Sequence, residues 1–149
     1  MAYLGYATQT LLDSFDGHMT GMIPADFLSL VEASIWFIPK AADADFDAQF
    51  VIMAATSGEP YNVKQTNSPI IQWVLVKDQI FSYNLTALVP VAIAANDVLG
   101  VGFSSLGPGN QPVELVGLRL RYKIRFPEMS GLAVEREAFW TCEKSELPH

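Results

Sequence analysis

The stretch VELVGLRLRYKIRF, Val113 to Phe126, decides the fold class. From Leu118 onward, apolar and cationic residues alternate, and a period of two is typical of a β-strand with one buried face. The apolar set is Leu118, Leu120, Tyr122, Ile124 and Phe126. The cationic set, called the basic stripe below, is Arg119, Arg121, Lys123 and Arg125. The stretch therefore predicts a long strand that buries its apolar face and presents the basic stripe on the other.

The basic stripe holds four of only nine lysines and arginines in a chain of net charge −7. Four like charges in a line repel one another, so carboxylates are expected beside them, either on the next strand or on another subunit or scaffold. A third interpretation is a solvated face whose long cationic side chains discourage edge pairing. We expect the stripe to contact a subunit or partner. Nucleic acid is the least favoured partner, because the rest of the chain is acidic.

The composition predicts one domain that hides part of its surface. A chain of 149 residues is long enough to bury a core, and 50% of its residues are hydrophobic. Charged residues make up 17%, which is below the usual quarter, so an oligomer is expected. No apolar run approaches the ~20 residues that cross a bilayer, and residues 1–10 lack the pattern of a secretory signal. We therefore expect no membrane partner.

Short strands follow one another at regular spacing from residue 28. The predicted strands are Leu28–Pro39, 43–55, Tyr61–Gln65, Ile70–Val76, Gln79–Leu85, 88–94, 97–106 and the opening stretch. Ile70–Val76 and Gln79–Leu85 are expected to pair around a tight turn, and Gly107–Asn110 is expected to be another turn. Seven or eight short strands with almost no helical pattern predict an all-β protein, an antiparallel sandwich or barrel.

The two ends differ from this central domain, which we place at residues 28–126. Residues 1–27 mix small polar and large apolar residues without a sustained period, and they are interpreted as an N-terminal arm. Residues 127–149 form a short C-terminal tail, with one or two helical turns expected around Leu132 to Trp140. Phe139 and Trp140 are expected to anchor this tail to a surface.

Residues suited to catalysis or metal binding are few, and we expect neither an enzyme nor a cofactor. His18 and His149 both fall in the terminal segments, where a general base would lack a fixed geometry. The single cysteine, Cys142, excludes an internal disulfide and a cysteine-based zinc site. Asp43, Asp45 and Asp47 could offer three carboxylates to calcium, but Ala48 and Ala54 stand where a helix–loop–helix calcium loop needs glycine and glutamate. We therefore favour a solvated loop and predict no metal.

The tryptophans allow two interpretations. Trp36, Trp73 and Trp140 could stack on a sugar or a base. Trp73 lies inside an apolar strand, so we expect it in the core instead.

Two adjoining stretches carry a resemblance. Asn96–Phe103, the turn Gly107–Gly109 and Val113–Tyr122 resemble the last two strands of jelly-roll domains in phage structural proteins, where an "ND-x-L" strand precedes a "GL-x-L-x-Y" strand. The order of the earlier strands is similar too, from a first strand that ends at Pro39 to one around Trp73. The resemblance covers about residues 30–126 and implies an antiparallel jelly-roll sandwich.

The resemblance also implies a role. Domains of this group assemble as homotrimers, and many are head decoration (cement) proteins on the virion exterior, made in the host cytoplasm. The expected partners are other copies of the chain and the major capsid protein. The arm residues that would contact the capsid are Tyr3, Tyr6, Leu11, Leu12 and Phe15. The alternative is a carbohydrate- or receptor-binding module of a tail fibre or spike.

Overall fold

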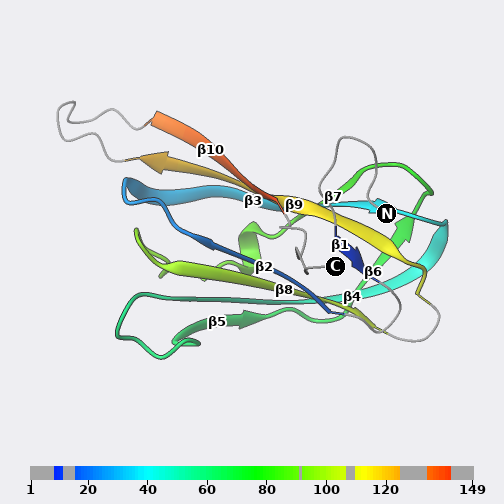
Figure 1. Cartoon of the computed structure of the whole chain (residues 1–149), viewed down its shortest axis with the longest axis horizontal. Coiled ribbons are helices and arrows are strands. Elements are labelled where there is room, and N and C mark those ends of the chain that lie inside the picture. Colours follow the sequence, from blue (N-terminus) through cyan, green and yellow to red (C-terminus); the bar gives the residue numbers. More distant parts are fainter. Residues whose placement is uncertain (1–8, 12–15, 91, 107–109, 125–133, 142–149) are drawn as a thin grey trace, which may run out of the picture.

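The protein is all-β in the part that its computed structural model describes, residues 9–11, 16–90, 92–106, 110–124 and 134–141. Two antiparallel sheets pack face to face as a sandwich, sheet A above sheet B in Figure 1. The described helical structure is a single 3-10 turn, η1 (Thr86–Leu88). The predicted all-β sandwich is confirmed.

Sheet A is built around the opening stretch of the sequence. Its strands are β1 (Gln9–Leu11), β3 (Phe27–Pro39), β7 (Phe81–Asn84), β9 (Val113–Ile124) and β10 (Val134–Thr141). The order is β1-β9-β3-β7, with β10 also paired to β9. β1 pairs with residues 113–115 of β9 and β10 with residues 117–124, so the two lie along the same edge of β9.

Sheet B faces sheet A with a matching arrangement. Its strands are β2 (Asp16–Met22), β4 (Asp43–Ala55), β5 (Lys64–Asn67), β6 (Ile71–Leu75) and β8 (Val98–Leu106). The order is β2-β8-β4-β5, with β6 also paired to β4. β6 pairs with residues 43–48 of β4 and β5 with residues 51–54, so these two share the far edge of β4.

The core lies between the sheets and is rich in aromatic rings. The predicted alternation in β9 is confirmed, since Leu118, Leu120, Tyr122 and Ile124 are buried while the residues between them are more exposed. Trp73 is 6% exposed, and its ring centroid lies 5.3–5.9 Å from those of Phe37, Phe46, Phe50 and Phe103. Trp73 is therefore a core residue, as expected.

The sandwich begins earlier in the chain than residue 28. Within the segment interpreted as an arm, β1 pairs with β9 and β2 pairs with β8 along its whole length. Met19, Ile23 and Phe27 are buried in the core. The alternation of β2 is hidden in the sequence because the positions that share a side with Met19 are Gly17 and Gly21, which carry no side chain.

Two predictions for residues 70–94 were wrong. β6 and β7 do not form a hairpin, since β6 pairs with β4 in sheet B and β7 with β3 in sheet A. The turn between them instead crosses from one sheet to the other, where the N–H of Asp78 donates to the carbonyl of Pro39 at 2.9 Å. Residues 88–94 were expected to be a strand, but η1 ends at Leu88 and the described residues after it form a bend and a turn. Pro90 lacks the N–H that a strand ladder needs.

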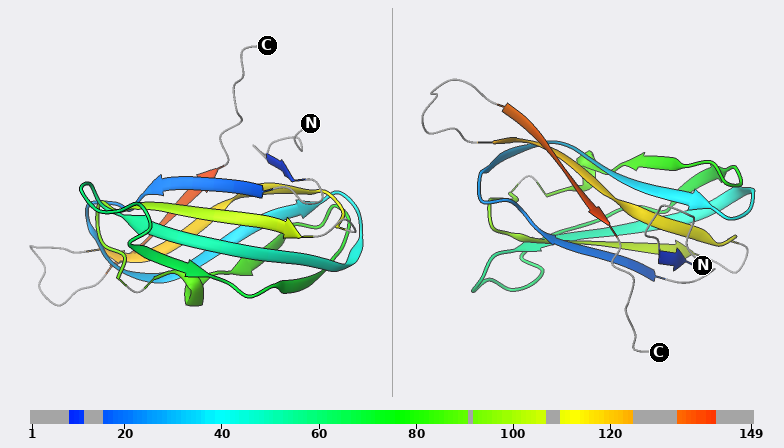
Figure 2. Two further views of the ribbon diagram at one scale, coloured as in Figure 1. Left: turned by 90° about the horizontal axis from the view of Figure 1, so that it is seen from below. Right: turned by 45° about the horizontal axis from the view of Figure 1, so that its top comes forward.

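The C-terminal prediction of a helical turn was also wrong. Val134–Thr141 forms strand β10, which runs antiparallel to β9 from Val134 opposite Ile124 to Thr141 opposite Gly117. Figure 2 (right) shows β10 beside β9 at the edge of sheet A. Pairing with the long strand β9 overrides the local preference of a segment rich in glutamate and alanine.

Candidate functional site

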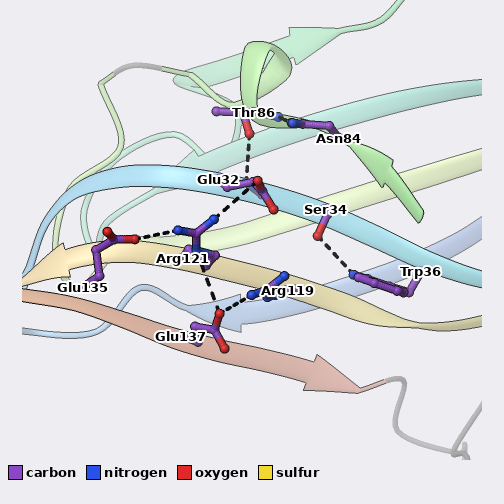
Figure 3. A network of polar contacts seen from close by, with 10 residues as sticks. Glu32, Ser34, Trp36, Asn84, Thr86, Arg119, Arg121, Glu135 and Glu137 are labelled. Carbon is purple, nitrogen blue, oxygen red and sulfur yellow. Dashed lines mark hydrogen bonds and ion pairs between the residues drawn. The ribbon is translucent and has the colours of Figure 1, made fainter. Parts of the chain in front are cut away.

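The basic stripe lies on the outer face of sheet A, between two rows of carboxylates. β9 has β3 on one side and β10 on the other, and the residues opposite Arg121 are Glu32 and Glu137. Arg121 contacts Glu135 at 2.9 Å, Glu32 at 3.6 Å and Glu137 at 3.9 Å (Figure 3). One guanidinium thus joins carboxylates from the two neighbouring strands. The expectation that carboxylates of a neighbouring strand lie beside the basic stripe is confirmed for Arg121.

Arg119 is held in the same network. Its Nη2 donates to Oε1 of Glu137, the carboxylate oxygen that also lies near Arg121 (Figure 3). The hydrogen bond to Glu137, with the negative charges of Glu137 and Glu32, raises the pKa of Arg119 above its ordinary value. The charged form is therefore favoured, and the pair is complete at neutral pH and is lost only in strong alkali.

The remaining members of the stripe differ from these two. Lys123 is exposed, and among the described residues no ion pair is formed by it. Arg125 lies outside the described residues. The expectation that the stripe contacts a subunit or partner stays a prediction, and Lys123 is the described cation best placed to meet one.

The two aromatic residues of the tail face opposite ways on β10. Trp140 is partly buried, packs against the core and lies against Gly21 of β2, in the opposite sheet. Phe139 is 48% exposed, and its ring lies over Gly117 of β9 on the outer face. Trp140 therefore joins the edges of the two sheets, while Phe139 belongs to the outer face of sheet A.

The predicted arm contacts fall almost entirely outside what the structure describes. Leu11 is in β1, opposite Val113 of β9. Tyr3, Tyr6, Leu12 and Phe15 lie outside the described residues. Their role on a capsid stays a prediction.

The outer face of sheet B carries a hollow that the sequence analysis did not anticipate. Gly100 and Gly102 of β8 form its floor, and β2 and β4 form its sides through His18, Thr20 and Met53. The hollow has a volume of about 460 Å³. The signal was present in the sequence, because glycines at alternate positions of a strand leave one face without side chains.

A second hollow adjoins the first along β2. It has a volume of about 450 Å³, shares His18 and Thr20, and is bounded on its other side by Phe139 and Trp140 of β10. His18 was placed in the arm by the sequence analysis but stands in β2, opposite Gly102. The two hollows form one surface that crosses β2.

The aspartates singled out for calcium have structural partners instead. Asp43 accepts hydrogen bonds from the N–H groups of Asp45 at 3.0 Å and Gln111 at 2.9 Å. The backbone of Asp47 is paired at both its N–H and its carbonyl by the side chain of Asn110. Within the described residues, no group of three metal-ligating side chains could hold an ion. These contacts tie residues 110–111 to β4.

Comparisons with known proteins complete the description of the site. Searches against protein-family models, curated proteins and solved structures found no match for the chain. Among the described residues, no helix is long and apolar enough to cross a membrane.

Proposed function

We propose that this protein is a viral structural protein of jelly-roll fold, most specifically a capsid decoration (cement) protein that acts as a homotrimer on the virion exterior. The strand order supports the fold. The order β1-β9-β3-β7 faces the order β2-β8-β4-β5, with β6 also paired to β4. Strands β1 to β4 therefore alternate between the sheets, and the late strands β9 and β8 insert between β1 and β3 and between β2 and β4. A jelly roll is an eight-stranded double sheet built from two Greek keys, and this strand order supports that proposal. The stretches that carry the sequence resemblance fall on the inserted strands β8 and β9.

The observation that carries the structural role is the outer face of sheet B. It is a sheet face without lysine or arginine among its described strand residues, and exposed apolar side chains stand on it, such as Met22 at 61% and its neighbour across the strand pair, Val98, at 44%. Contiguous apolar surface of this kind marks a protein–protein contact. The chemistry of a capsid-binding protein is association, and the apolar hollow on this face supports such a contact.

The mechanism of such a protein is thermodynamic. A ligand that binds only the assembled shell shifts the equilibrium towards it, by a free energy that grows with occupancy. A trimer presents each contact three times, so weak contacts combine through effective concentration. The N-terminal residues Tyr3 and Tyr6 would supply contacts of this kind beyond the sandwich.

The test is binding to the capsid of the virus that encodes the protein. A truncation must spare β1 and β2, because both are strands of the sandwich and β2 carries the buried Met19. Deleting residues 2–8 is therefore the matched variant. We expect a trimer by light scattering in both forms, sedimentation of the full chain with capsids, and at least tenfold weaker sedimentation of the truncated form. A monomer that does not sediment with capsids would refute the proposal.

The second hollow favours one alternative, a carbohydrate- or receptor-binding module. Its lining residues include Trp140, whose ring lies against β2, and the polar residues His18, Thr20 and Thr141. Its volume of about 450 Å³ is within the range of small-molecule sites. Quenching of tryptophan fluorescence by sugars, abolished in Thr20→Val, would support this alternative over capsid binding.

A further inference from the structure

Trp36 lies outside the core, unlike the other two tryptophans. Trp73 is a core residue and Trp140 packs against the core, whereas Trp36 does neither. It stands on the outer face of β3 and is partly exposed, since its neighbours Ile35 and Phe37 are buried inward. Tryptophan is highly buried on average, so an indole on an outer face needs a reason other than packing of the sandwich.

The indole of Trp36 is held in a fixed position. Its Nε1 donates to Oγ of Ser34 at 3.1 Å, and Ser34 is 5% exposed (Figure 3). This hydrogen bond satisfies the one donor of the indole, so the rest of the ring offers apolar surface. A ligand that contacts this ring meets a side chain that is already ordered, which lowers the entropy cost of binding.

A second aromatic ring lies on the same face. In the register of sheet A, Gly117 of β9 stands opposite Trp36 on one side and Thr141 of β10 on the other. Phe139 covers this glycine, since an added Cβ at Gly117 would lie 2.8 Å from Cζ of the ring. The ring therefore rests on the backbone of β9, and because Phe139 is 48% exposed, ring surface stays open to solvent. Trp36, Gly117 and Phe139 are called the aromatic platform below.

Neutral polar groups flank the aromatic platform. Ser82 of β7 stands opposite Trp36, and Ser82, Asn84 and Thr141 are all exposed. The carboxamide of Asn84 is oriented, because its Oδ1 accepts the N–H of Thr86 at 2.8 Å (Figure 3). Hydroxyl and amide groups of this kind can both donate and accept hydrogen bonds.

The charges beside the aromatic platform balance one another. From Gly117 to Lys123, the outer positions of β9 and the positions opposite them hold three cations and three carboxylates, which are Arg119, Arg121 and Lys123, and Glu32, Glu135 and Glu137. Arg119, two residues from Gly117, is paired with Glu137. A phosphate or another anionic ligand needs an excess of cations, whereas these charges sum to zero. Charge complementarity therefore favours a neutral ligand.

We propose that the aromatic platform binds a neutral oligosaccharide. A sugar ring has a face of C–H groups that stacks on aromatic rings, and a rim of hydroxyls that can hydrogen-bond to Ser82, Asn84 and Thr141. The two rings come from β3 and β10, which lie on either side of β9 and hence about 10 Å apart, so a chain of linked sugars fits better than a single one. The site lies on sheet A, whereas the proposed capsid contact lies on sheet B, so sugar binding does not depend on the capsid role.

Calorimetric titration of the full-length chain tests the site with neutral hexasaccharides of glucose, mannose, galactose and N-acetylglucosamine. We expect at least one of them to bind, and Trp36→Ala and Phe139→Ala each to weaken that binding roughly tenfold, the scale of a lost aromatic contact. Tyr61→Ala removes an aromatic ring that is 76% exposed elsewhere, and Thr20→Val alters the second hollow. Both controls should bind as the wild type does. Far-ultraviolet circular dichroism checks that each variant is folded.

Tryptophan fluorescence gives a second readout that a general loss of stability would not reproduce. Trp36→Phe keeps an aromatic ring, so the variant should still bind in the calorimeter but lose the change in emission, because Trp73 lies in the core and Trp140 against it.

Three outcomes would overturn the sugar site. They are no binding of any hexasaccharide at millimolar concentration, unchanged binding by Trp36→Ala, and a loss of binding in Thr20→Val alone, which would place the sugar in the second hollow. Sedimentation with capsids is measured separately, so none of these outcomes decides the capsid role.

Discussion

The two outer faces of the sandwich carry different kinds of side chain. On sheet A, arginines of β9 stand between carboxylates of β3 and β10, and the charges satisfy one another (Figure 3). On sheet B, the described strands contain a single lysine, Lys64, and it turns inward to the buried Asp97. On one face Arg119 and Arg121 are paired within a single chain, and the other face presents apolar side chains and a groove. The difference indicates which face an assembly would cover.

The largest change in the free energy of unfolding should follow from loss of the buried ion pair between Lys64 and Asp97. Nζ of Lys64 lies 2.7 Å from Oδ2 of Asp97, with side chains 17% and 2% exposed, and the same oxygen accepts the N–H of Ala94 at 2.9 Å. Lys64→Met would leave the Asp97 carboxylate buried without its cation, which typically costs about 3–5 kcal/mol. We expect that loss in the free energy of unfolding by urea denaturation. Lys77→Met, at an exposed turn, is the control, and a loss equal to the control would show that the pair is dispensable.

Glycines on the two faces provide the next comparison. At Gly117 of sheet A, an added Cβ would lie 2.6 Å from the carbonyl oxygen of Trp140 and would also meet the ring of Phe139. Gly117→Ala should therefore push β10 away from β9 and cost about 1–3 kcal/mol, the usual range for overpacking. Gly102→Ala on sheet B should instead stabilise the strand by about 0.5–1 kcal/mol, because its Cβ fits and alanine loses less backbone entropy. Thermal unfolding of both variants checks the opposite signs, and equal shifts would contradict the argument.

The ion pairs on the outer face of sheet A should contribute less to the free energy of unfolding than the Lys64–Asp97 pair or the packing at Gly117. Arg121→Gln removes contacts to Glu32, Glu135 and Glu137 from a side chain that is 32% exposed. Exposed pairs are worth about 0.2–1 kcal/mol each, and salt screens them. We expect a loss of about 1 kcal/mol at low ionic strength that shrinks in molar salt. A loss that salt does not change would mean that the arginine acts through packing of its aliphatic stem.

The strands predicted from the sequence are those in which apolar and polar residues alternate along a single segment. In β4, β8 and β9, alternate residues are apolar and buried, so the local sequence alone indicates a strand. Phe46, Phe50 and Ile52 on β4 are examples. The pairing of β6 and β7 with different sheets could not be read in the same way. It depends on contacts with β4 and β3 that lie far away in the sequence, and a two-residue turn signal favoured a local hairpin.

The candidate surfaces were predictable only in part, for a related reason. The need for carboxylates beside the basic stripe followed from charge alone, and Glu135 and Glu137 already stand at alternate positions in the sequence. Which carboxylates meet the stripe depended on β10 being a strand, and its glutamates and alanine had favoured a helix. The groove needed the positions of β2 and β4 on either side of two glycines, and no one-dimensional pattern contains that information.

A substitution of Lys123 should have the smallest effect on stability, and it tests whether the outer face of sheet A has a partner. Lys123 is exposed on β9, and the glutamate opposite it, Glu135, forms its described ion pair with Arg121. Lys123→Gln should change the free energy of unfolding by less than about 0.5 kcal/mol, as surface substitutions usually do. If the stripe meets an acidic surface on a capsid, the same variant should weaken sedimentation with capsids severalfold and reduce its sensitivity to salt. Unchanged binding would show that the basic stripe serves only to join β3, β9 and β10, and the contrast between the two faces would then be complete.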